Sequence, residues 1–329
     1  MKPLVGVYYH DPGGEAALAP VLDTLARDGR VYLAIGKTQE RPALVLTATS
    51  LEGPEREAIV QAHLDGVPSL SVLDFWSNYR LRFENGNGLV LPDKIAVMDY
   101  LAVREMKAEG FPESRLVITG QPAFDCLAER RKDFNERHAY WTRKYYGFRE
   151  GRKTVVFASQ PLAAQPYDYG FNEHTVLPLV IQAVNELGVD LIIRPHPREY
   201  IGDLECYASP NVRILRRGLV HELLMSADLV VGMNSELLVE ACYLGCNVLS
   251  VQPGMRGVDH LPTNRIGISK AVYCAKDLAK TMGEILFRGI SLRYWKEKRD
   301  RWIYQKPAAP KVAALVYQMI GVKNAEPGY

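Results

Sequence analysis

An arginine and a histidine stand between two prolines, directly after a run of aliphatic residues, in the stretch DLIIRPHPREY. The aliphatic run is typical of a strand buried on both faces of a parallel sheet, so Arg194 and His196 should emerge where this strand ends. Pro195 and Pro197 restrict the backbone that presents them. Because ligands of open α/β sheets bind beyond the carboxyl ends of strands, this pair predicts an anion-binding site. The alternative is that Arg194 pairs with a carboxylate and His196 caps a neighbouring element.

A second candidate for anion binding follows the strand-like run DLVVG, in GMNSELLVEACYLG. Asn234 or Ser235 can cap the next helix, whose free N–H groups and positive dipole end would then face a phosphate. Any capped helix has such residues at its start. Because Glu240 and Gly245 follow these residues along the same predicted helix and at its end, we favour nucleotide binding over a plain helix cap.

Two further strand ends carry polar residues. Ser159 and Gln160 in FASQPL could donate hydrogen bonds to phosphates from the opposite wall, or they could simply form a strand-to-loop turn. Arg256 in QPGMRG could reach either a phosphate or bulk water. Both alternatives stay open for each strand end.

The first strand runs into YYHDPGGEAALAPVL, which places His10, Asp11, Gly13 and Gly14 between a strand and a helix. Paired glycines allow the backbone to approach a ligand closely, so we assign Gly13 and Gly14 to the diphosphate. A plain turn would explain the glycines but not the two residues before them. A histidine hydrogen-bonded to an aspartate would make a general base, so His10 and Asp11 are catalytic candidates.

Asp74 stands at the end of another aliphatic run, in VLDFWSNYRLRF, before aromatic and hydrogen-bonding residues suited to a sugar. Core packing could absorb Phe75, Trp76 and Phe83, but it would not obviously need the carboxylate. We therefore rank Asp74 beside His10 as the catalytic base.

Strand-like runs alternate with segments of helical period over residues 4–120 and again over residues 154–253, which predicts two doubly wound parallel sheets. The charged, aromatic segment 129–152 interrupts this pattern. We place the boundary there, with an acceptor domain at 1–148 and a nucleotide-sugar-binding domain at 149–329. Helices are expected at 276–289, at 291–305 and over the last apolar segment, which can pack back on the first domain. Ligands should bind in the cleft between the domains.

The 329 residues are 47% hydrophobic and 24% charged, as in a soluble globular protein long enough for two domains. A net charge of +2 is too small a basic excess to predict nucleic-acid binding. Five scattered cysteines and no leader-like start favour a cytoplasmic protein with reduced thiols. Because the sequence has no D-x-D pair and no His/Cys cluster with ligand spacing, we predict neither a metal nor a cofactor.

The segments MKAEGFPESRLVITGQPAFDCL and ADLVVGMNSELLVEACYLGCNVLSVQPG resemble those of the GT-B superfamily. The likeness is greatest to the UDP-N-acetylglucosamine 2-epimerases and related glycosyltransferases, and it covers most of the chain in element order. It implies a GT-B fold with two Rossmann-like domains facing a cleft. It also implies that His196 contacts the nucleotide diphosphate, that Glu240 faces the ribose hydroxyls, and that the loop at His10 meets donor and acceptor.

The glutamate-bearing motif of the 2-epimerases is missing after the strand that ends at Asp74, and their two elimination–addition carboxylates have no clear counterparts. We therefore expect a metal-independent glycosyltransferase of surface glycan or polysaccharide biosynthesis. It would move a sugar from a nucleotide-sugar donor to a hydroxyl acceptor, with Arg194, His196 and helix N–H groups stabilising the diphosphate. A 2-epimerase, a nucleotide-sugar hydrolase and a non-catalytic binding module are the alternatives.

Basic aromatic segments at 140–152 and 293–306 could touch a membrane surface, where lipid-linked acceptors reside. Helices of this composition are more often solvated faces with buried stems, so membrane contact is the secondary interpretation.

Overall fold

The computed structural model describes residues 2–86, 88–288 and 307–322. The chain forms two compact units, one with residues up to Cys126 and the C-terminal helix, the other beginning at Leu127. The helix expected at 291–305 and the basic segment 293–306 lie outside the described residues, as does the end of the helix expected at 276–289.

The first unit contains a six-stranded sheet in the order β2-β1-β3-β4-β5-β6. All its neighbouring strands pair in parallel. Its strands are β1 (Leu4–Tyr8), β2 (Tyr32–Ile35), β3 (Leu44–Thr47), β4 (Ser69–Val72), β5 (Lys94–Val97) and β6 (Leu116–Ile118). Its helices include α1 (Pro12–Asp28), α2 (Glu55–Leu64), α3 (Tyr79–Phe83), α4 (Tyr100–Ala108) and α14 (Ala308–Met319).

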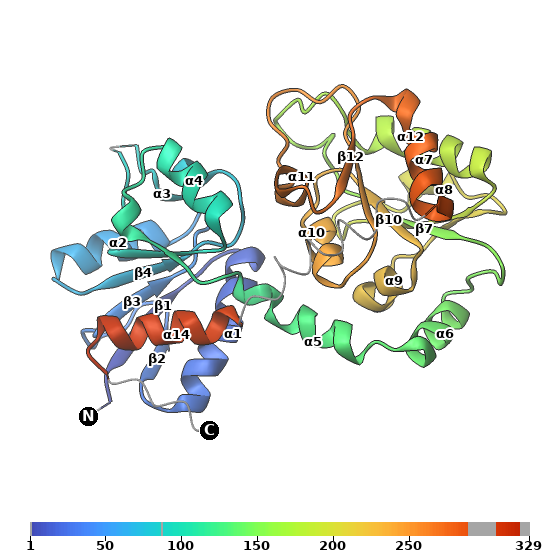
Figure 1. Ribbon diagram of the computed structural model, residues 1–329. Coiled ribbons are helices and arrows are strands. Elements are labelled where there is room, and N and C mark those ends of the chain that lie inside the picture. The colour runs from blue at the N-terminus through green and yellow to red at the C-terminus, as the bar shows by residue number, and fades with distance from the viewer. Residues whose placement is uncertain (1, 87, 289–306, 323–329) are drawn as a thin grey trace. The chain divides into compact units, whose positions relative to one another are not determined.

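Helix α14 packs along α1, as the red helix beside the blue one shows in Figure 1. Val312 and Val316 of α14 are fully buried in the same apolar cluster as Leu18 of α1 and Val5 of β1. The backbone N–H groups of Ala308 and Ala309 donate to the Asp125 carboxylate at 2.8 Å, which fixes the start of α14. The last helix is therefore part of the first unit.

The second unit contains another six-stranded parallel sheet, in the order β12-β11-β10-β7-β8-β9. Its strands are β7 (Thr154–Ala158), β8 (Asp190–Arg194), β9 (Val212–Ile214), β10 (Leu229–Gly232), β11 (Val248–Val251) and β12 (Lys270–Val272). Strand order reverses between β7 and β10, where Ala158 pairs with Gly232, so the switch point of the sheet lies there.

The helices of the second unit include α5 (Asp125–Asp133), which begins before the division, α6 (Glu136–Tyr145), α7 (Glu173–Leu187), α8 (Gly202–Glu205), α9 (Val220–Ser226), α10 (Glu236–Tyr243), α11 (Pro262–Ile266) and α12 (Leu278–Gly283). Helix α6 packs on α9, and Arg149 pairs with the buried Asp190 of β8. Residues 127–148 therefore belong to the second unit, whereas we expected the boundary after residue 148.

Candidate functional site

A cavity of about 410 Å³ opens beyond the carboxyl ends of β7, β8 and β10 in the second unit. Five of the predicted site residues line it, and all five belong to this unit. The lining comprises Ser159, Arg194, Pro195, His196, Pro197, Arg216, Val220, Ser235, Glu236, Leu237 and Glu240. The cavity therefore lies at the switch point, where α/β sheets bind their ligands.

Arg194 is half-buried, and part of its guanidinium is used inside the protein. Nη1 donates to the carbonyl oxygens of Leu215 and Arg217, both at 3.2 Å. Burial lowers the pKa of Arg194 below its ordinary value. Among the described residues Nε and Nη2 have no hydrogen-bond partner, so Arg194 both holds the loop after β9 and keeps donors for an anion.

His196 presents a neutral donor to the cavity. Its Nδ1 accepts a hydrogen bond from the backbone N–H of Arg198 at 3.1 Å, which leaves the ring hydrogen on Nε2. Burial lowers the pKa of His196, so the ring is uncharged near neutral pH. The imidazole can therefore donate to an oxygen through Nε2 without carrying a charge.

Glu199 organises the wall between β7 and β8. Its carboxylate accepts from Ser159 Oγ at 2.6 Å and from the backbone N–H of His196 at 2.5 Å. The hydroxyl hydrogen of Ser159 thus points to Glu199, so Ser159 would meet a ligand as an acceptor. Sequence reasoning missed Glu199, although its place three residues after His196 could have suggested a local hydrogen bond.

Helix α10 begins at the cavity. Ser235 caps it, because its Oγ accepts from the backbone N–H of Leu237 at 3.2 Å. Glu236 in the first turn also lines the cavity and brings negative charge to the same end of the helix. An anion bound by the N–H groups at this end would therefore lie close to the carboxylate of Glu236.

Two buried amide oxygens lie just beyond the switch point. Asn234 is 8% exposed, and neither its Oδ1 nor Oε1 of Gln160 has a hydrogen-bond partner in the described part of the chain. Each residue follows its strand by the same two positions, and those strands pair at Gly232 and Ala158. An unsatisfied buried acceptor costs about 1–3 kcal/mol, so a donor from a ligand would relieve it.

Glu240 meets a residue that sequence reasoning missed. Its Oε2 lies 2.6 Å from Nε2 of His221 on α9, and Nδ1 of the same ring lies 3.0 Å from Nη1 of Arg130 on α5. Nothing in the local sequence of His221 marks it, because the contact depends on how α9 and α10 pack. The pair places one Glu240 oxygen in a fixed position at the cavity.

Arg256 pairs with a carboxylate and not with the cavity. It pairs with Asp168, and both side chains are largely exposed. Such a surface pair contributes little to stability. Arg256 is not among the residues that line the cavity.

In the first unit, the loop before α1 is largely explained by helix capping and close packing. Asp11 caps α1 by accepting from the backbone N–H of Gly14 at 2.7 Å. A Cβ on Gly14 would lie 2.7 Å from Cβ of Ala48, closer than real contacts allow, so this glycine permits the approach of α1 to β3. Gly13 is less constrained, with Oδ2 of Asp74 at 3.0 Å from the place of a Cβ.

Asp74 is 9% exposed and forms a buried ion pair with Arg82 of α3. The same carboxylate oxygen, Oδ1, accepts from Oγ1 of Thr49 at 2.7 Å. Arg82 also donates to the backbone carbonyl of Thr49 at 2.6 Å. This carboxylate thus serves a network that joins β4 to α3.

His10 is exposed and lies beside a buried carboxylate. Gly53 has φ +143°, and a side chain there would clash with both Oε2 of Glu55 and Cβ of His10. Glu55 is 3% exposed; Oε1 accepts from Oγ of Ser50, while Oε2 has no partner among the described residues. Sequence reasoning missed Glu55, because a glutamate in the first turn of a helix is usually explained by its favourable interaction with the helix dipole.

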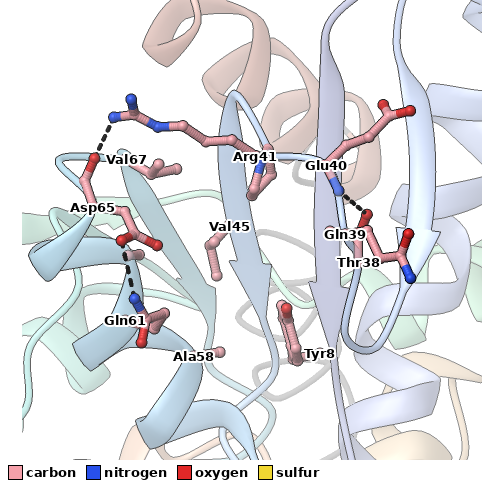
Figure 2. Close-up of a pocket in the computed structure, with 12 residues that line it drawn as sticks. Tyr8, Thr38, Gln39, Glu40, Arg41, Val45, Ala58, Gln61, Asp65 and Val67 are labelled. Atoms are coloured by element: carbon pink, nitrogen blue, oxygen red, sulfur yellow. Dashed lines mark hydrogen bonds between the residues drawn. The ribbon is translucent and has the colours of Figure 1, made fainter.

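A second cavity, of about 370 Å³, lies in the first unit between α2 and the segment that joins β2 to β3 (Figure 2). Tyr8, Val45 and Ala58 form part of its lining. On its rim Arg41 donates to the carbonyl of Asp65, whose carboxylate accepts from Gln61 at 3.0 Å. None of the residues predicted for the site lines this cavity.

The described residues contain no group of three or more His, Cys, Asp and Glu side chains placed to hold a metal ion. Within the same ranges, no helix has both the length and the apolar character needed to cross a bilayer.

Two successive Rossmann-like units with parallel sheets define the GT-B class of folds, and comparison with solved structures confirms this predicted fold. The chain is similar to UDP-GlcNAc 2-epimerase from Neisseria meningitidis bound to UDP-GlcNAc (14% identity, 96% of this chain and 99% of that chain, TM-score 0.65). It is also similar to an S. aureus MnaA–UDP co-structure (12% identity, 100% and 99%, TM-score 0.71). A third similar structure is the glycotransferase of kitacinnamycin (14% identity, 96% and 97%, TM-score 0.62).

No protein-family model and no curated protein matches the sequence. At these identities the structural likeness establishes the fold, and the reaction has to be argued from the site itself.

Proposed function

We propose that this protein is a metal-independent glycosyltransferase that moves a sugar from a nucleotide-sugar donor to a hydroxyl acceptor. The observation that carries the proposal is the cavity at the switch point, where His196, Ser235 and Glu240 line one space. The neutral N–H of His196 and the helix start at Ser235 suit the phosphates of a nucleotide sugar. The carboxylate of Glu240 suits its ribose. Solved structures of the same fold hold UDP-GlcNAc or UDP.

In the proposed reaction the acceptor oxygen forms a bond to the anomeric carbon, while the bond from that carbon to the diphosphate oxygen breaks. The leaving nucleoside diphosphate keeps the electron pair. Nε2–H of His196, the unpaired donors of Arg194 and the first N–H groups of α10 stabilise its charge. Glu236 and Glu199 oppose an anion here, so these donors have to outweigh two nearby carboxylates.

We assign removal of the acceptor proton to His10 in the first unit. Asp74 is held by Arg82 and Thr49, and Asp11 caps α1. His10 has no such engagement among the described residues, and the buried carboxylate of Glu55 lies on the same side of Gly53.

Incubation with UDP-, CDP-, GDP- and CMP-sugars, with and without a mixture of hydroxyl acceptors, tests the proposal. Release of nucleotide that depends on an acceptor is the expected result. Release in water alone would favour the second candidate, a 2-epimerase or nucleotide-sugar hydrolase, which the likeness to the 2-epimerase structures supports. A thermal shift with no turnover would indicate a non-catalytic binding module.

We further propose that the acceptor is lipid-linked and that α6 touches the membrane that carries it, as surface glycan or polysaccharide biosynthesis would require. Helix α6 has no buried residue, and it exposes Tyr140 and Trp141 at 54% each and Tyr145 at 80%. Lys144 lies 5.3 Å from the centre of the Trp141 ring. Aromatic and cationic side chains on one short helix suit an anionic bilayer surface.

We propose that the reaction takes place in the cytoplasm. All five cysteines lie among the described residues, and none forms a disulfide. In a reducing compartment such cysteines would remain thiols.

A further inference from the structure

A chain of three side chains from three helices ends at the nucleotide cavity. Arg130 of α5 contacts His221 of α9 through Nη1 and Nδ1 at 3.0 Å. His221 in turn contacts Glu240 of α10 through Nε2 and Oε2 at 2.6 Å. All three residues belong to the second unit, and Glu240 lines the cavity.

The two contacts define the tautomer of His221. An arginine has only donors, so Nδ1 of His221 must be the acceptor of the Arg130 hydrogen bond. The hydrogen of the neutral ring then sits on Nε2 and is donated to the Glu240 carboxylate. The His221 side chain is 17% exposed and the Glu240 side chain 24%, so this hydrogen bond to a charged group is mostly shielded from water.

The consequence for Glu240 is a fixed carboxylate. Oε2 is occupied by His221, while Oε1 has no hydrogen-bond partner among the described residues and remains available at the cavity. A glutamate without such a partner would lose side-chain freedom when it bound a ligand. Holding the side chain before the ligand arrives removes part of that cost.

We propose that His221, supported by Arg130, is a positioning residue that aims the free oxygen of Glu240 at a ribose hydroxyl. The inference rests on the proposed function, because it requires a nucleotide in this cavity. It adds a property that the proposed function does not contain: the site selects ribonucleotides over 2′-deoxyribonucleotides, and this selection depends on a residue that does not line the cavity.

The experiment measures Kd by calorimetry for UDP, CDP and GDP and for their 2′-deoxy counterparts, using the full chain. For the base that binds, wild type should prefer the ribonucleotide by about tenfold or more, as expected when a hydroxyl leaves a charged partner unpaired. His221→Ala should weaken ribonucleotide binding by about fivefold to tenfold and leave the 2′-deoxy compound within about twofold. The preference should therefore largely disappear.

Two further variants separate positioning from simple structural support. His221→Gln should keep most of the preference, because its amide can accept from Arg130 and donate to Glu240. Arg130→Met should lower the preference in part; Arg130 is exposed, so this variant is expected to fold even where His221→Ala does not. His174→Ala, at a histidine on α7 whose side chain is 58% exposed, is the matched control and should change neither Kd.

Equal weakening of ribonucleotide and 2′-deoxyribonucleotide binding in the His221→Ala and Arg130→Met variants would overturn the inference, because a general structural role predicts that result. Wild type that binds both sugars equally well would also overturn it while leaving the proposed function in place. If wild type bound none of the six compounds, both the inference and the proposed function would be excluded.

Discussion

Asp74 and Arg82 form an ion pair inside the first unit, with Asp74 only 9% exposed. The pair joins the end of β4 to α3, and Thr49 adds a hydrogen bond to the same carboxylate oxygen at 2.7 Å. A carboxylate in this position stabilises its surroundings, because its removal leaves a buried cation without a counter-charge.

Asp74→Asn should therefore destabilise the first unit by about 3–5 kcal/mol, the cost of breaking a buried ion pair from one side. Urea unfolding followed by tryptophan fluorescence measures the change. Asp23→Asn, at an exposed position on α1, is the control and should stay close to wild type. An Asp74→Asn protein of unchanged stability but without turnover would instead restore Asp74 as the base.

His10→Ala should lower kcat by about 10²- to 10⁴-fold, the usual contribution of a general base. Nucleoside diphosphate affinity should not change, because His10 is not among the residues that line the cavity proposed to bind it. Acceptor-dependent release of nucleotide is the measurement, and His63→Ala at an exposed histidine of α2 is the control. Full activity of His10→Ala would exclude the assigned role.

Arg194→Ala should weaken nucleoside diphosphate binding by about 1–3 kcal/mol, measured by calorimetry. Both roles of the guanidinium contribute, since Nη1 holds the carbonyls of Leu215 and Arg217 and the remaining donors are left for an anion. Arg194→Lys keeps the charge but loses the fork of donors, so its affinity should fall between those of wild type and Arg194→Ala. Unchanged affinity in both variants would refute a role in binding.

The fold was predictable from the sequence because buried parallel strands appear as aliphatic runs, and those runs place His196 and Ser235 at strand ends. The contacts that complete the site were not predictable. Arg82 meets Asp74, and His221 meets Glu240, only through packing between separate elements. Pattern reasoning shows which residue ends a strand, but not which side chain from another helix will reach it.

Stability should depend on pH through His196. Burial lowers its pKa in the folded protein, so the unfolded chain binds a proton more readily. The contribution of this histidine is therefore complete above the unfolded pKa of about 6.5 and is lost as the pH falls below that value. His260, whose pKa burial also lowers, acts in the same direction.

The free energy of unfolding should decrease between about pH 6.5 and 5, and His196→Gln should make this decrease shallower. Urea unfolding at several pH values measures it. His138→Gln, at an exposed histidine of α6, gives the comparison for a general effect of removing a histidine. A steeper decrease in His196→Gln than in wild type would mean that the assigned direction of the pKa shift is wrong.

The exposed aromatic side chains of α6 give the last prediction. Wild type should sediment with vesicles that contain anionic lipid, and it should bind less as salt is raised, because Lys144 and Arg137 act through long-range attraction. Trp141→Ala combined with Tyr145→Ala should lower the partition coefficient by about a hundredfold or more, since each aromatic ring buried in the interface contributes roughly 1.5–3 kcal/mol.

Tyr200→Ala is the matched control for this test, because Tyr200 is 74% exposed in the same unit but lies outside α6. It should bind vesicles as wild type does. If the double variant and the Tyr200 variant bind equally well, α6 is a solvated helix whose aromatic residues do not touch a membrane. The acceptor proposed for the transfer reaction would then have to reach the protein from solution, and soluble saccharides would become the compounds to test.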